Sequence, residues 1–174
     1  VATGASAASL PGIEFDHDRI MNAKSALELK DVPDRLLIVG GGYIGLEMGT
    51  IYHALGTEVK IVEMMSGIMP GMDRDLIEVV EKELKEVLKG ARFETKVKSV
   101  EKTEGGIRAT LENKDGETTE EQYDKMLVAV GEVPNTENIG LDQVGIEVDD
   151  KNFIKVNEYR QTNIHHIYAI GDVA

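Results

Sequence analysis

A glycine-rich segment carries the clearest chemistry in the sequence. Gly40, Gly42 and Gly45 follow the G-x-G-x-x-G spacing. Gly40 would allow a tight turn out of a strand, Gly42 has no Cβ and would let a pyrophosphate approach the backbone, and Gly45 would let the next helix pack closely on the strand. The free N–H groups and the positive end of that helix favour bound phosphates. The segment therefore predicts a dinucleotide-binding loop.

A single acidic residue supports this prediction and bears on the choice of cofactor. Glu63 lies 23 positions after Gly40, where a carboxylate that binds ribose is expected about 20 residues on. The 2′ and 3′ hydroxyls of NAD can donate hydrogen bonds to Glu63, whereas the 2′-phosphate of NADP would be repelled. No Arg or Lys occurs between Glu63 and Arg74 to pair with such a phosphate. The sequence therefore favours NAD; without the loop, Glu63 would be an ordinary exposed acid at a strand end.

The elements around the loop follow an α/β pattern. Residues 36–39 form an apolar run typical of a buried parallel strand, and residues 44–55 have helical spacing up to Gly56. Residues 58–63 predict a second strand, and residues 22–29 a short helix. Asp73 is expected to cap a helix that ends at Gly90. Its predicted apolar face consists of Leu76, Val80, Leu84 and Leu88.

The second half of the chain changes character. Residues 93–100, 107–112 and 117–123 alternate apolar and polar side chains, which is typical of an antiparallel meander exposed on one face. Residues 126–130 return to the apolar pattern of a parallel strand, and 153–156 and 167–170 are two further strand-like runs. We therefore predict a Rossmann-like parallel sheet with helices and an inserted three-stranded antiparallel β-meander.

The composition limits the class of protein. The 174 residues are 41% hydrophobic and 29% charged, which suffices for a globular core. A net charge of −13 argues against nucleic acid or an anionic membrane as partner. No cysteine is present, so this chain has no disulfide, metal–thiolate site or thiol catalysis. With no long apolar run and no signal peptide, we expect a cytoplasmic protein.

Five motifs in order resemble those of a known family. They are Ala2-Thr3-Gly4; Leu10-Pro11-Gly12 with the run 26–29; the loop from Gly40 to Gly49; Val130-Gly131 with Pro134-Asn135-Thr136; and Thr162 with the run 168–172. Together they resemble the flavoprotein disulfide reductases, which include glutathione reductase, and within them the NAD-binding domain of dihydrolipoamide dehydrogenase. The resemblance covers nearly the whole chain.

The resemblance implies roles for individual residues. The pyrophosphate of NAD would be lined by Gly40, Gly41, Gly42, Tyr43, Ile44 and Gly45. Glu63 would bind the adenosine ribose, and Val97 would touch the adenine. Gly131 would lie beside the nicotinamide half, with Glu47 pointing toward the nicotinamide–flavin junction unless it only favours the helix dipole. Thr3, Gly4 and Asp172 match positions that bind FAD in the longer parent protein.

The same resemblance implies a redox relay in the parent protein. A dithiol would reduce a cysteine pair, the pair would reduce FAD, and the flavin would pass a hydride to NAD. Without cysteines, this chain would hold only the NAD half, so we expect no catalytic residue, no metal and no activity of its own. Glu132 stands where the family usually has Arg, and Ala5 where Ser is common; the reversed charge at Glu132 is expected to weaken NAD binding.

The expected organisation is that of an excised piece of enzyme. Residues 1–8 would be a remnant of an FAD-domain strand and linker, 9–33 a crossover, 34–133 the NAD-binding domain, 134–160 a connecting segment, and 161–174 a second FAD-domain remnant. The expected partners are the dinucleotide and the missing FAD and interface domains. Two alternatives remain: a free-standing NAD-sensing module, which the apolar ends 1–3 and 167–170 disfavour, and a related flavin reductase acting on another disulfide or a quinone.

Other candidate residues have simpler interpretations. His165-His166 is interpreted as structural, because no acid lies at ligand spacing. His17 and His53 are interpreted as surface or packing residues. The acidic stretch 117–121 is expected to be a solvated hairpin edge, and Met64, Met65, Met69 and Met72 are expected to be flexible core filler.

Overall fold

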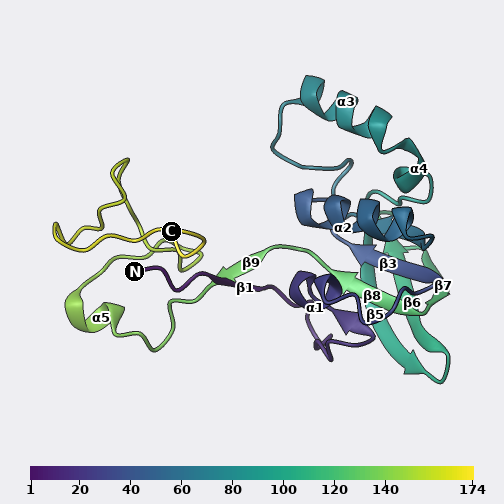
Figure 1. Ribbon diagram of the computed structural model, residues 1–174, viewed down its shortest axis with the longest axis horizontal. Coiled ribbons are helices and arrows are strands. Elements are labelled where there is room, and N and C mark those ends of the chain that lie inside the picture. Colours follow the sequence, from purple (N-terminus) through teal and green to yellow (C-terminus); the bar gives the residue numbers. More distant parts are fainter. The chain divides into compact units, whose positions relative to one another are not determined.

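A computed structural model describes all residues from 1 to 174, and they divide into two compact units (Figure 1). The terminal unit comprises Val1–Ala8 and Gly131–Ala174, and the sheet unit comprises Ser9–Val130. The glycine loop and Glu63 both belong to the sheet unit. The functional boundaries predicted above remain predictions.

A four-stranded parallel sheet forms the middle of the sheet unit. Its order is β2 (Ile20–Met21), β8 (Lys125–Val128), β3 (Arg35–Val39) and β4 (Glu58–Val62). Leu36, Leu37 and Ile38 are fully buried, as expected for a strand with both faces covered. The α/β fold with its inserted antiparallel meander is confirmed.

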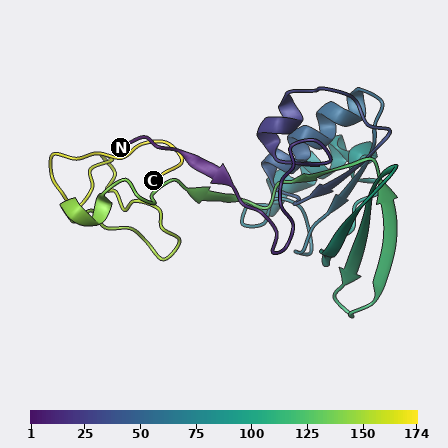
Figure 2. The same ribbon diagram turned by 90° about the horizontal axis from the view of Figure 1, so that it is seen from below.

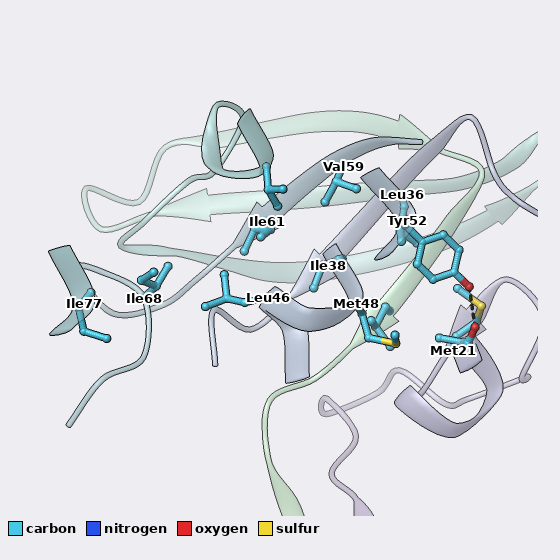
Figure 3. Close-up of a cluster of buried hydrophobic side chains, with 13 residues drawn as sticks. Met21, Leu36, Ile38, Leu46, Met48, Tyr52, Val59, Ile61, Ile68 and Ile77 are labelled. Atoms are coloured by element: carbon cyan, nitrogen blue, oxygen red, sulfur yellow. Dashed lines mark hydrogen bonds between the residues drawn. The ribbon is translucent and has the colours of Figure 1, made fainter. Parts of the chain in front are cut away.

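The helices cover one face of this sheet. Ile38 and Ile61 pack there against Leu46 and Met48 of α2 (Tyr43–Ala54), as Figure 3 shows. The same core includes side chains from α1 (Ala23–Leu27), α3 (Arg74–Glu83) and α4 (Lys85–Leu88). The Tyr52 hydroxyl of α2 donates to the Ala26 carbonyl at 2.8 Å and so ties α2 to α1.

The meander covers the opposite face (Figure 2). It consists of β5 (Thr95–Thr103), β6 (Gly106–Asn113) and β7 (Thr118–Tyr123), paired antiparallel in that order. Its buried side chains Ile107 and Leu111 pack with Leu37, Val39 and Val62 of the parallel sheet. Because side chains alternate along a strand, each strand of the parallel sheet serves both cores.

The segment predicted as one helix from Asp73 to Gly90 differs from the prediction in its continuity, its buried face and its N-cap. It is interrupted at Leu84, where α3 ends and α4 begins. Its buried side is centred on Ile77, which is 1% exposed, whereas Leu76 is 55% exposed. Ile77, Val80 and Leu84 follow the i, i+3, i+7 spacing of one helix face, and Leu76 lies one position off it. Asp73 occupies the N-cap position, but its side chain makes no capping hydrogen bond.

The terminal unit contains little regular structure. β1 (Ala5–Ala7) pairs antiparallel with β9 (Glu132–Pro134), so Ala5–Ala7, which lie within the residues 1–8 predicted as a strand remnant and linker, form a strand. The short helix α5 (Leu141–Val144) contributes Leu141 to a small apolar core. The strands predicted at 153–156 and 167–170 are reduced to the single bridges Val148–Ile154 and Gln161–Tyr168, because neither run meets an extended partner along its length. No helix of the chain is both long and apolar enough to cross a membrane.

Candidate nucleotide-binding site

The glycine loop lies where the strand order of the parallel sheet reverses. It follows the carboxyl end of β3, with β4 on one side and β8 on the other. β4 follows β3 along the chain, whereas β8 returns to the other side after the meander. In open α/β sheets, ligands bind in the crevice at such a reversal, outside the carboxyl ends of the strands.

Gly40 makes the turn out of β3, and only glycine fits there. Its φ is +111°, and a Cβ would lie 2.3 Å from the Ala129 carbonyl oxygen. Its N–H donates to the Val62 carbonyl at 2.9 Å, which joins the loop to the end of β4. The close approach of Gly40 to the backbone after β8 therefore fixes the loop at the reversal point.

Gly45 and Gly49 bring helix α2 close to the sheet. A Cβ on Gly45 would lie 2.1 Å from the Gly40 carbonyl oxygen and 3.3 Å from Ile38 Cγ2. A Cβ on Gly49 would approach Val87 Cγ1 at 3.3 Å and Ile38 Cδ1 at 3.4 Å. The absence of side chains on this face of α2 allows the helix to start directly above the end of β3.

Gly42 faces open space at the start of α2. It is the N-cap residue, with φ −77° and ψ 179°, and a Cβ there would meet no atom within 4 Å. The backbone of Gly42 therefore does not require glycine, since any residue adopts this extended conformation. The first N–H groups of α2, beginning at Tyr43, have no acceptors within the helix.

Glu63 lies beside the loop and is only 9% exposed. Its Oε2 accepts the Gly41 N–H at 2.7 Å, and its Oε1 accepts the Met65 N–H, also at 2.7 Å. The Gly41 carbonyl in turn accepts the Met69 N–H at 2.9 Å. The Gly41 N–H is therefore directed at Glu63, and the predicted place of Gly41 along the pyrophosphate stays a prediction. Each carboxylate oxygen keeps a lone pair for a further donor.

The other predicted site residues are distributed over both units. Val97 is half-buried and packs against the core under the meander, and the nearby Thr95 N–H donates to the Glu63 carbonyl at 3.0 Å. Glu47 is exposed on α2. The remaining residues belong to the terminal unit: Thr3, Gly4, Gly131, Glu132 and Asp172. Gly131 has a φ of +129°, and the side chains of Glu132 and Asp172 are exposed. The Thr3 hydroxyl donates to the Asn135 carbonyl at 2.8 Å.

A charged cavity that reaches Met64, the residue after Glu63, was not predicted. It has a volume of about 270 Å³, and its lining residues are Met64, Glu94, Lys96, Glu112, Asn113, Lys114 and Gly116. Lysines therefore reach the residue next to Glu63 from the meander, although none is near in sequence. Lys114 binds Glu94 at 2.7 Å, and Lys96 binds Glu112 at 2.7 Å. Hydrogen bonds from Lys96 and Lys98 lower the pKa of Glu112 to about 2.

Two predictions about surface residues need correction. Met64, Met65 and Met72 are largely exposed, and only Met69 of that group packs on the core. These exposed methionines lie in the connection between β4 and α3, which passes the glycine loop. In the acidic stretch 117–121, the first four residues are exposed, but Glu121 accepts a hydrogen bond from Tyr123 at 2.5 Å and pairs with Arg92.

Lys125 is a buried charge that sequence reasoning missed. Its ammonium group binds Asp31 at 2.6 Å and Asp18 at 3.3 Å. Burial lowers the pKa of Lys125, but these two carboxylates outweigh it and raise the pKa overall. Lys125 begins β8, at the amino ends of the strands, whereas the glycine loop lies at their carboxyl ends. We therefore assign it a structural role.

The two adjacent histidines of the terminal unit are both exposed. His165 and His166 contact each other edge to face, with ring centroids 5.0 Å apart. No group of three or more His, Cys, Asp or Glu side chains lies close enough to hold a metal ion.

Comparison with known proteins identifies the family of the chain. The family described as pyridine nucleotide-disulphide oxidoreductase matches residues 1–174. The chain belongs to this family. Among curated relatives, it is 46% identical over 173 residues to dihydrolipoyl dehydrogenase of Vibrio parahaemolyticus and 39% identical to that of Haloferax volcanii. In both cases 99% of this chain aligns with 36% of the relative's length.

Solved structures show the same likeness. LpdA from Mycobacterium tuberculosis matches with a TM-score of 0.85 and 34% identity, over 99% of this chain and 37% of that one. The HOCl-induced flavoprotein disulfide reductase RclA from Escherichia coli, as its Cu(II) complex, matches with a TM-score of 0.83 and 27% identity, over 99% and 39%. The chain thus spans little more than a third of the proteins it resembles.

Proposed function

We propose that the sheet unit binds NAD(H) within a flavin-dependent dihydrolipoamide dehydrogenase. The observation that carries this proposal is the juxtaposition of an open helix N-terminus at Gly42 with the buried carboxylate of Glu63, at the point where the strand order reverses. This arrangement offers phosphate-binding N–H groups and a ribose acceptor on neighbouring strand ends.

The loop geometry fits the pyrophosphate. The N–H groups of Gly42, Tyr43, Ile44 and Gly45 open the helix, and nothing crowds the Cβ position of Gly42. Gly40 and Gly41 act differently, because they shape the turn, and Gly45 also holds α2 close to β3. In this proposal the helix N-terminus contacts the phosphates and the other glycines support it.

The surroundings of Glu63 fit a ribose with free hydroxyls. The carboxylate retains acceptor capacity beyond its two backbone hydrogen bonds, and it is close to the first residues of β5. A 2′-phosphate at this place would meet the Glu63 carboxylate, while Lys96 and Lys114 are engaged with Glu112 and Glu94. Like charges at a partly buried site repel by roughly 1 kcal/mol or more, so we assign NAD rather than NADP.

In the parent enzyme, the role of this chain is to place the nicotinamide ring. A dithiol substrate would deliver two electrons to FAD, and NAD would accept a hydride from the reduced flavin. Glu47 and Gly131 are each proposed to lie toward the nicotinamide half, and Glu132, which follows Gly131 in the chain, is proposed to weaken the affinity for NAD. Thr3, Gly4 and Asp172 of the terminal unit are proposed to contribute to FAD binding in the complete protein.

Calorimetric titration with NADH and NADPH tests this proposal. We expect NADH to bind and NADPH to bind at least about fivefold more weakly. Equal or tighter binding of NADPH would overturn the assignment of NAD. No binding of either nucleotide at millimolar concentration would overturn the site itself.

A further inference from the structure

We infer that Glu63 is a positioning residue which holds the glycine loop in shape before any nucleotide arrives. Its two carboxylate oxygens engage two separate backbone N–H groups, one in the loop and one in the connection from β4 to α3. This role is distinct from binding ribose. Any effect of Glu63 on nucleotide affinity through this role rests on the function proposed above. The claim that Glu63 holds the loop in shape does not depend on that function.

The Gly41 peptide unit is held from both sides. Its N–H donates to Glu63 Oε2 at 2.7 Å, and its carbonyl accepts the Met69 N–H at 2.9 Å. Glu63 is 9% exposed, so water competes little for these bonds. Bonds this short to an ionised carboxylate are the stronger kind of protein hydrogen bond.

Met69 completes the arrangement at a conformational cost. Its φ is +46°, in the left-handed region that side chains disfavour, and it is not a glycine. The adjacent Ile68 is fully buried, and Met69 packs against the same core. Packing of these two side chains keeps the Met69 N–H directed at Gly41 despite the unfavourable backbone.

Steric fit supports the same inference. A Cβ on Gly41 would approach Glu63 Cβ, Cγ and Oε2 at 3.3 Å each. The glycine therefore lets its backbone lie directly against the acid side chain. The peptide of Gly41 is fixed in orientation, and the N–H groups of the next four residues, Gly42 to Gly45, have no protein acceptor; the Leu46 N–H is the next to be bonded, to the Gly42 carbonyl at 3.0 Å.

The chemistry of two donors requires a carboxylate rather than an amide. Glutamine has the same shape as glutamate, but it presents one acceptor oxygen and one NH₂ donor. Whichever way the amide of Glu63→Gln turns, either the Gly41 N–H or the Met65 N–H would face another donor. A residue needed only to accept ribose hydroxyls would not have this requirement, because a glutamine oxygen can accept a hydroxyl.

Amide hydrogen exchange in the nucleotide-free chain, followed residue by residue by NMR, tests this inference. In the unsubstituted chain we expect the Gly41 and Met65 amides to exchange at least tenfold more slowly, relative to their intrinsic rates, than the Gly42 amide. In Glu63→Gln, we expect exchange at Gly41 or Met65 to accelerate about ten- to a hundredfold, which corresponds to loss of one charge-assisted bond.

Glu58→Gln is the matched control. It makes the same change in charge at the other end of β4, where Glu58 is exposed and contacts Arg35 only at 3.7 Å, whereas Glu63 directly follows the strand. We expect exchange at Gly41 and Met65 to change less than twofold in this variant. The inference would be overturned if the Gly41 amide of the unsubstituted chain exchanged as fast as the Gly42 amide. It would also be overturned if Gly41 and Met65 exchanged at equal rates in the two variants. Because no nucleotide is present, such a result is distinguishable from a failure to bind NADH.

Discussion

Alanine substitution at two glycines of the same loop separates nucleotide binding from folding. Gly42 and Gly45 are three residues apart, yet a Cβ meets nothing within 4 Å at Gly42 and lies 2.1 Å from the Gly40 carbonyl oxygen at Gly45. The backbone of Gly42 is extended, with φ −77°, so alanine is tolerated there in the absence of ligand. Alanine at Gly42 should therefore lower nucleotide affinity, whereas alanine at Gly45 should lower the stability of the fold.

For Gly42→Ala, we expect a large loss of NADH affinity with little change in stability. The methyl group would occupy the space through which a pyrophosphate approaches the N–H groups. Loss of one charge-assisted hydrogen bond of about 1.5–3 kcal/mol weakens binding by one to two decades. The thermal midpoint should stay within about 2 °C of the parent, since neither core contacts nor backbone conformation change.

For Gly45→Ala, we expect destabilisation first. The methyl group cannot avoid the Gly40 carbonyl unless α2 moves away from β3, and overpacking of this kind costs about 1–3 kcal/mol. At about 2–4 °C per kcal/mol for a chain of this size, the thermal midpoint should fall by roughly 2–12 °C.

NADH titration and thermal unfolding by circular dichroism, applied to both variants, provide the assay. Gly105→Ala is a suitable control, because a Cβ there also meets nothing within 4 Å and the residue lies in the β5–β6 turn. We expect this control to match the parent in both measurements. Parent-like NADH affinity in Gly42→Ala would refute the assignment of this loop to the pyrophosphate.

Two further predictions concern pH and activity. Burial raises the pKa of Asp16, but the hydrogen bond from Lys102 and the N–H groups of Ile20 and Asp18 outweigh it and lower the pKa from 3.8 to about 2. Asp16 therefore stabilises the fold above pH 4, and about 1–2 kcal/mol should be lost between pH 4 and pH 2; urea unfolding should show that Asp16→Asn lacks this part of the pH dependence. Because the chain has no cysteine, it should not oxidise dihydrolipoamide by itself, and turnover by the purified chain, followed as NADH formation at 340 nm, would contradict the assigned role.

The sequence pattern was most informative where local rules and tertiary structure agree. The apolar run 36–39 between Pro33 and the glycines could only be a buried strand, and it forms β3. The alternation in 107–112 likewise predicted β6, because one face packs on the sheet and the other faces solvent. Both elements are specified by short-range sequence patterns, the first by a continuous apolar run and the second by alternation.

The sequence was less informative where a contact depends on distant segments. Nothing near Gly41 in sequence indicates that its N–H binds Glu63, because that bond arises only when β4 pairs beside β3. In the same way, Lys96 and Lys114 reach Met64 through the fold of the meander. Leu76 and Ile77 are equally apolar, and only the docking of α3 decides which of them is buried.

The central claim, that this loop and Glu63 bind NAD(H), is tested most directly by adding NADH to the ¹⁵N-labelled chain and following every backbone amide by NMR. The account predicts saturable shifts centred on Gly42, Tyr43 and Ile44, with smaller shifts at Glu63, and no comparable shifts around Lys125 at the opposite edge of the sheet. Shifts that are absent at millimolar NADH, or that cluster away from the glycine loop, would contradict it.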